Sequence, residues 1–318
     1  MFLVNWAKLI INQKHMKKGI FGNWFLKPLL LTSIHIPIWI LGALFVSPYY
    51  PINHAEPGLF DETTGLILLS FINTLLIILL INSSKWHGWH LSILLGVAYY
   101  GSFTFNTQIE TWYFLSDLTV SPELLPRLFL MGLPVPFLFI PLAVITYRKW
   151  TKKNTKQSAQ YMLMSKQQFI LKLAIISFIY LIIYWSAGYF IAWQNPDLRA
   201  FYGSEGEIIS FWRHTGQTIK NEPGLMALQI IRGCLFAIIA IPVIRGSLKN
   251  PWPTAILVAL LLAVPHLGHI LANPLIPEAS VRMSHMLETT SSTFLFGLII
   301  FWLLHREHYS MRDLFSIP

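Results

Sequence analysis

Charged residues are scarce in this sequence. Only 12% of its 318 residues are Asp, Glu, Lys or Arg, whereas 54% are hydrophobic. Soluble domains carry roughly a quarter charged residues. A chain with so little charge cannot cover a globular surface with polar side chains, so its apolar excess must face lipid instead of water. The scarcity of charge therefore excludes an ordinary water-soluble domain.

Several other features are missing. Cys234 is the single cysteine, which excludes an internal disulfide. The sequence has no His-Glu-x-x-His, Gly-x-Ser-x-Gly, Walker or Gly-x-Gly-x-x-Gly pattern, so no short motif identifies a known enzyme class. Its formal charge of +9 would suit a nucleic-acid-binding protein. The basic residues, however, cluster at the ends of apolar runs, and we expect no nucleic-acid partner.

The apolar runs are long enough to be membrane spans. A helix of about 20 residues crosses roughly 30 Å of hydrocarbon. Stretches of that length lie at 28–49, 64–82, 91–109, 127–147, 168–193, 224–245, 253–273 and 284–304. The third is the weakest of the eight because it carries Thr104, Asn106 and Gln108. The sequence predicts an all-α, polytopic integral membrane protein with about eight transmembrane helices.

The chain is predicted to have one membrane domain and one short N-terminal segment. Residues 1–27 are expected to form an amphipathic helix in the membrane interface, because Asn5, Lys8 and Asn12 share one face and apolar residues surround it. Residues 28–318 form a single transmembrane domain. The basic cytoplasmic loop 148–167 divides this domain into two four-helix halves, between which we find no residue repeat.

Basic residues indicate the orientation of the spans. With the N-terminus in the cytoplasm, 17 of the 23 Lys and Arg residues fall on the cytoplasmic side, and only Glu307 and Asp313 of the 14 acidic residues do so. This is the asymmetry that the positive-inside rule requires. We therefore expect both termini in the cytoplasm, and a plasma (inner) membrane as the location.

Polar residues inside the last two spans follow a regular spacing. His266 and His269 lie three residues apart near the end of the seventh span, and His285 and Glu288 lie three apart near the start of the eighth. Such a spacing places side chains on one helix face, which a metal site in a helical bundle needs. These four residues are candidate ligands for Zn or Fe. Without a metal, His285 and Glu288 are candidate catalytic acid–base groups, and a plain hydrogen-bond network is the structural alternative.

Arginines near the same depth suggest how a substrate is held. A buried guanidinium suits a carboxylate or phosphate, so Arg232 and Arg282 are candidate substrate-binding residues, together with Gln229 and Tyr184. The alternative for Arg232 is a structural ion pair with Glu288, and we slightly favour it.

Two classes of function follow from this cluster. The first is a membrane enzyme, metal-dependent or not, that acts on a lipid-like or anionic substrate. The second is a non-enzymatic carrier or membrane scaffold in which the same cluster is proton-sensitive or purely structural. Membrane lipids are the expected partners, and a homo-oligomer or other membrane proteins remain open.

Overall fold

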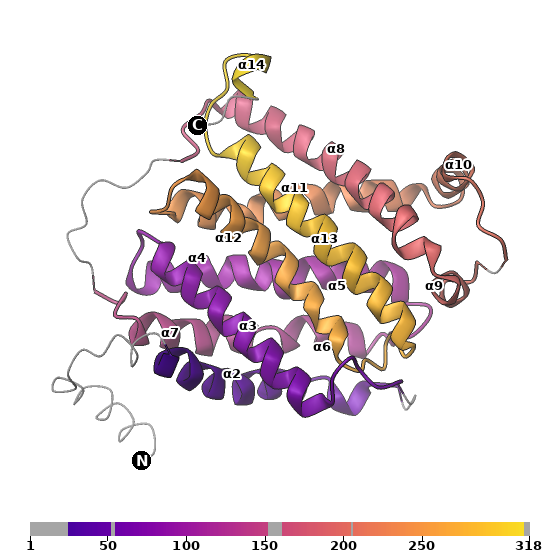
Figure 1. Cartoon of the computed structure of the whole chain (residues 1–318), viewed down its shortest axis with the longest axis horizontal. Helices are drawn as coiled ribbons and strands as arrows, with labels where there is room; N and C mark the ends of the chain where they lie inside the picture. The colour runs from indigo at the N-terminus through magenta and orange to yellow at the C-terminus, as the bar shows by residue number, and fades with distance from the viewer. Residues whose placement is uncertain (1–24, 52–54, 152–160, 205, 315–318) are drawn as a thin grey trace.

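The fold is a bundle of helices that run side by side (Figure 1). We describe it from a computed structural model that covers residues 25–51, 55–151, 161–204 and 206–314. Within these ranges there is no strand, and one isolated bridge pairs Ser84 with Ser247. The prediction of an all-α membrane protein is confirmed. The predicted interfacial helix 1–27 falls almost entirely outside the described residues.

The α-helices divide between the two halves of the chain, before and after the basic loop. Those of the first half are α2 (Lys27–Ala43), α3 (Glu62–Ser83), α4 (Gly88–Tyr100), α5 (Asn106–Leu115), α6 (Leu124–Met131) and α7 (Ile140–Thr146). Those of the second half are α8 (Lys166–Phe190), α9 (Pro196–Phe201), α10 (Phe211–Asn221), α11 (Pro223–Gly246), α12 (Pro251–Ala263), α13 (Ala279–Leu304) and α14 (Met311–Leu314). The short 3-10 helices η3 (Ser47–Tyr49) and η6 (Ala192–Gln194) extend α2 and α8.

Three further segments change the helical pitch within spans. Two are π-helical, η4 (Gly101–Phe105) between α4 and α5 and η5 (Val135–Phe139) before α7. The third is the 3-10 helix η7 (Val264–Ile270), which continues α12. Each is continuous with a helix of the bundle, so the backbone changes its pitch within the span instead of ending there.

Seven helices are long and apolar enough to cross a membrane, and they coincide with seven of the eight predicted spans. The remaining prediction, 91–109, falls on the helical stretch from α4 through η4 to α5. This stretch is not among the seven because its second half is polar: it contains Ser102, Asn106 and Glu110.

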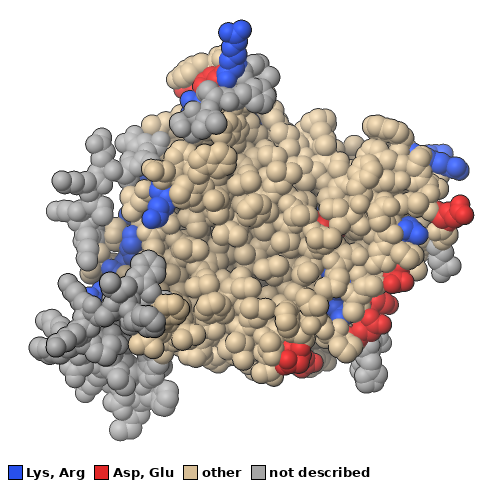
Figure 2. Space-filling model, viewed as in Figure 1, with Lys and Arg blue, Asp and Glu red and all other residues tan. Residues whose placement is uncertain are grey.

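The two ends of the bundle differ in charge. Basic residues lie where α2, α4, α8 and α12 begin, and acidic residues gather at the opposite end (Figure 2). We call these the basic end and the acidic end. The acidic end comprises the segment 55–61, the segment 116–123, the α9–α10 region and the start of α13. The middle of the surface in view carries few charges, as a lipid-facing belt requires.

Close contact between α12 and α13 sets the position of the polar residues at the acidic end. A Cβ on Gly297 would lie 2.5 Å from the Ala259 Cα, so only glycine permits this approach of the two helices. Phe296 and Ile300 of α13 pack beside it in the main apolar core. α13 also contacts η7, which continues α12 towards the acidic end.

Candidate functional site

The histidines of the seventh span project from a 3-10 helix. Pro265 has no N–H to donate, and at that point the α-helical pitch of α12 gives way to the tighter pitch of η7. Residues three apart lie above one another in a 3-10 helix. The side chains of His266 and His269 therefore project from the same side of η7.

His285 lies at the centre of a hydrogen-bonded chain of three side chains. Its Nδ1 is 3.3 Å from Glu288 Oε2, and its Nε2 is 3.1 Å from the Tyr202 hydroxyl oxygen. Glu288 is only 5% exposed. When the carboxylate accepts the Nδ1–H, Nε2 is left as an acceptor for the tyrosine hydroxyl, which is the tautomer of a neutral imidazole. The predicted pair His285–Glu288 is thus formed, with Tyr202 as an additional member.

Tyr202 is the C-cap residue of α9. The predicted spans place this segment in a loop on the outer side. Burial is the main reason why the pKa of Tyr202 lies well above its usual value, and the negative charges of Glu110 and Glu288 raise this pKa further. The phenol therefore stays protonated and donates to His285. The ring of His269 stacks on the His285 ring, with centroids 6.0 Å apart, and completes this part of the cluster.

Arg232 makes a two-pronged ion pair with Glu110. Its two terminal nitrogens lie 2.5 and 2.6 Å from the two carboxylate oxygens, and one of them also donates to Gln229 Oε1 at 2.9 Å. The slightly favoured pairing of Arg232 with Glu288 is therefore wrong. Glu110 escaped the sequence analysis because the expected third span ends at residue 109. The available signal was its position four residues after Asn106 on the same helix face.

Two tyrosines of α8 connect the Arg232–Glu110 pair to the hydrogen-bonded side chains around His285. The Tyr180 ring centroid is 5.8 Å from the Arg232 guanidinium carbon and 6.2 Å from the Tyr184 ring centroid. Tyr184 interacts electrostatically with both Glu110 and Glu288. The two carboxylates therefore belong to one polar region between α5, α8, α11, η7 and α13.

The Arg282 side chain is hydrogen-bonded to backbone carbonyl groups at the acidic end. Its terminal nitrogens donate to the carbonyl oxygens of Ile276, Pro277, Glu56 and Pro57 at 2.6–2.9 Å. Each of the four terminal hydrogens of a guanidinium can serve one such acceptor. Arg282 therefore fastens the segment 56–57 to the loop before α13, and its fork is not available to an anionic substrate in this structure.

A metal site is not assembled from these residues. The described part of the chain contains no group of three or more His, Cys, Asp and Glu side chains arranged to hold a metal ion. Both ring nitrogens of His285 are already hydrogen-bonded. The prediction of Zn or Fe stays a prediction.

Comparison with known proteins assigns no family to the chain. No protein-family model, curated protein or solved structure matches the chain. Its function has to be argued from the cluster itself.

Proposed function

We propose that this protein is a proton-linked membrane carrier in which His285 and Glu288 bind the coupled proton. The observation that carries the proposal is the pairing of charges. Arg232 is neutralised by Glu110, and Arg282 is bound to carbonyl oxygens. The ion-pair partner of Glu288 among the described residues is a histidine, which is charged only when it is protonated.

A carboxylate buried among membrane helices is costly when it is charged and alone. Sharing one proton between Glu288 and His285 removes that cost, because the pair is then either a neutral acid beside a neutral base or an ion pair. Loss of the shared proton leaves an unbalanced negative charge inside the bundle. Binding and release of a proton at this place are therefore expected to drive repacking of the surrounding helices.

Changes of helical pitch within the spans support a functional site in the bundle. Stretches of π-helix inside α-helices are frequent at functional sites, and a 3-10 stretch within a helix often marks a hinge. The π-helical segments η4 and η5 and the 3-10 helix η7 are three such places. Two of them adjoin the polar region, since η4 leads directly to Asn106 and η7 carries His266 and His269.

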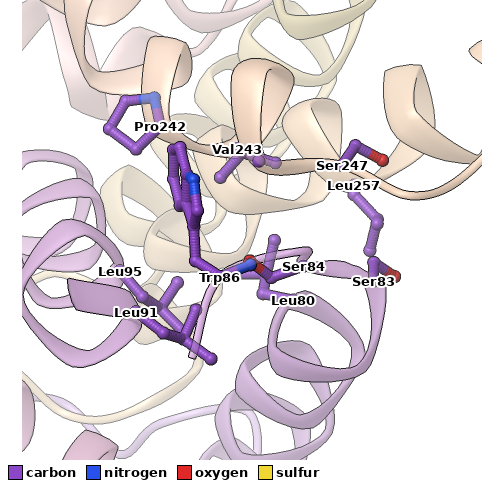
Figure 3. A pocket seen from close by; sticks show the side chains of 11 residues that line it. Leu80, Ser83, Ser84, Trp86, Leu91, Leu95, Pro242, Val243, Ser247 and Leu257 are labelled. Atoms are coloured by element: carbon purple, nitrogen blue, oxygen red, sulfur yellow. The ribbon is translucent and has the colours of Figure 1, made fainter. Parts of the chain in front are cut away.

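Contact between the two halves gives a second line of support. The turn after α3 and the turn after α11 exchange backbone hydrogen bonds, from Lys85 N to Gly246 O and from Leu248 N to Ser83 O, both 2.7 Å long. Trp86 packs over Pro242 and Val243 in the small pocket beside these turns (Figure 3). Carriers built from two parallel halves place their sites between the halves, as the polar region is here.

The basic end faces the cytoplasm in this proposal, by the positive-inside rule, so that Tyr202 lies on the opposite side. Protons then enter from the acidic end, by way of Tyr202, and reach His285 first. We propose a plasma (inner) membrane as the location, because a proton gradient across it would drive such a carrier.

The test is the protonation of Glu288. We would record the pH-dependent infrared band of protonated carboxyl groups for the purified protein in lipid, for wild type and for Glu288→Gln. The proposal expects a component of this band from a buried carboxyl group, which titrates in the wild type and is lost in the variant. Glu123→Gln, an exposed acidic residue at the same end, is the matched control and should keep the band. A spectrum identical in all three proteins rejects the proposal.

A membrane enzyme is the second candidate, and one observation favours it. A histidine held by a carboxylate on one nitrogen and by a hydroxyl on the other is an arrangement that acid–base catalysis uses. In that case His285 transfers a proton to or from a lipid-like substrate, and Glu288 orients the ring. Turnover of a lipid substrate that is lost in His285→Ala, without proton-linked flux, would favour the enzyme over the carrier.

A further inference from the structure

Helix α10, at the acidic end, has an apolar face that the rest of the described chain does not cover. None of its residues is buried. Trp212 is 81% exposed and Ile219 is 42% exposed. These two residues are seven apart, which is about two turns, so their side chains share one face of the helix. An exposed face of this kind marks a surface that binds another apolar phase.

A basic stripe lies beside the apolar face. Arg213 and Lys220 are also seven residues apart, both are exposed, and each follows one of the two apolar residues directly in the sequence. Gly216 lies between them, and a Cβ added there would meet nothing within 4 Å, so this side of the helix is open. No acidic residue occurs within Phe211–Asn221, although the rest of this end is acidic. Figure 2 shows basic residues at the edge of the molecule where Figure 1 places α10.

Contacts with α8 hold α10 at the level where a membrane span ends. The Phe211 ring stacks on the Phe190 ring, with centroids 5.2 Å apart, and the His214 ring lies 5.0 Å from that of Trp193. The span formed by α8 and η6 ends at Gln194, only a few residues further on. Phe190 is 61% exposed on this span, so its ring borders lipid. The apolar face of α10 therefore adjoins a lipid-facing surface of the bundle.

The direction of α10 agrees with this position. Figure 1 shows α10 nearly end-on, whereas α8 and α13 run across the picture. The axis of α10 is thus directed across the spans. A helix that crosses the spans at the level where one of them ends lies along the membrane surface, as amphipathic interfacial helices do.

We propose that α10 anchors the acidic end of the bundle to the adjoining leaflet. Trp212 and Ile219 enter the boundary between headgroups and acyl chains, a level at which tryptophan is enriched. Arg213 and Lys220 bind the phosphate groups of anionic phospholipids. Lipid fits this face better than a protein partner does, because the apolar and basic stripes adjoin each other as the two layers of a leaflet do. The anchor does not depend on the proton-linked carrier, and the titration of Glu288 does not bear on it.

The single cysteine of the chain permits a direct test. In a Cys234→Ser background, Ile219→Cys or Gln217→Cys carries a nitrobenzoxadiazole fluorophore, and the full-length protein is placed in nanodiscs of phosphatidylcholine and phosphatidylglycerol. Both positions are exposed, and residues two apart lie on nearly opposite sides of a helix. Spin-labelled lipids should quench the probe at 219, and aqueous iodide should quench the probe at 217. Equal quenching of the two probes by each quencher would overturn the anchor, as would a probe at 219 that only iodide reaches, the result expected if the face serves a protein partner.

A second measurement tests the basic stripe. Around the probe at Ile219→Cys, spin-labelled phosphatidylglycerol should be enriched roughly fivefold over spin-labelled phosphatidylcholine. Arg213→Gln combined with Lys220→Gln should abolish this preference while lipid quenching persists, and neither change disturbs a buried residue. Arg245→Gln combined with Lys249→Gln removes the same charge from exposed residues at the basic end and should leave the preference unchanged. An undiminished preference in the α10 double variant would overturn the role of the two basic residues.

Discussion

Arg232 binds a carboxylate that lies 122 residues earlier in the chain, that of Glu110, with two nitrogens on two oxygens. The arginine side chain is 2% exposed and the glutamate side chain 24%. This pair joins α5 to α11 across the two halves of the chain. Because Arg232 pairs with Glu110, the partner of Glu288 is His285. The proposed proton site depends on this division of the charged groups into two pairs.

The first prediction concerns the stability of this pair. Glu110→Gln leaves the guanidinium buried without its counter-charge, and loss of one partner of a buried ion pair costs about 3–5 kcal/mol. We expect a fall of about 3 kcal/mol, at the lower limit because Glu110 is partly exposed. Unfolding in detergent measures it, with Glu123→Gln as the control. The double variant Arg232→Met/Glu110→Gln should be more stable than Glu110→Gln alone, and the absence of that recovery would contradict a neutralised pair.

A second prediction separates structure from substrate binding at Arg282. Arg282→Lys replaces a planar fork that serves four carbonyl oxygens with a single ammonium group of three donors. We expect the free energy of unfolding to fall by about 2 kcal/mol, and amide hydrogen exchange in residues 55–61 to increase. Arg213→Lys, in which the exposed Arg213 of α10 is changed, should do neither. A stable Arg282→Lys variant that loses binding of an anionic compound would restore the substrate role that the sequence indicates.

The third prediction addresses the metal. If the cluster works by proton binding, freshly purified wild-type protein should contain less than one Zn or Fe per chain, and His269→Ala should not change that content. Elemental analysis of the two detergent-purified proteins measures it. A stoichiometric metal that is lost in His269→Ala would favour the metal-dependent enzyme, and the hydrogen bonds of His285 would then have to rearrange.

Seven spans were predictable because each is an apolar run whose length matches the thickness of hydrocarbon. Local spacing also predicted His285 beside Glu288 and Gln229 beside Arg232, since both pairs are three residues apart on a helix. The partner of Arg232 was not predictable in this way. Nothing local connects residue 110 with residue 232, and the choice between two carboxylates depends on how α5 and α11 pack.

Tyr202 shows a second limit of sequence reasoning. It lies between spans, where a solvated loop is the simplest expectation. In the structure, Asn195 caps α9 by accepting from the Asp197 N–H, and its side-chain amide donates to Ser284 Oγ and the Ser280 carbonyl oxygen of α13. This contact turns α9 over the start of α13 and brings Tyr202 to His285. Such docking depends on tertiary hydrogen bonds that spacing along the chain does not reveal.

A final prediction concerns pH at the basic end, where the segment after α13 folds back on α8. His308 Nδ1 lies 2.7 Å from Lys172 Nζ, and Gln168 exchanges two hydrogen bonds with the His308 backbone. Burial, and then the positive charge of Lys172, lower the His308 pKa from 6.5 to about 4. The folded segment therefore binds fewer protons than the released one.

The sign follows from that difference. Docking of this segment has its full stability above pH 6.5, weakens as the pH falls from 6.5 towards 4, and changes no further below that range. Hydrogen exchange of amides 306–314, corrected for the intrinsic effect of pH, should therefore show more opening at pH 5 than at pH 7.5. In His308→Gln the amide oxygen can still accept from Lys172 but does not titrate, so most of the pH dependence should vanish. If His308→Gln keeps the full pH dependence, another group must govern the docking, and His305, which is also buried and has a lowered pKa, becomes the one to change next.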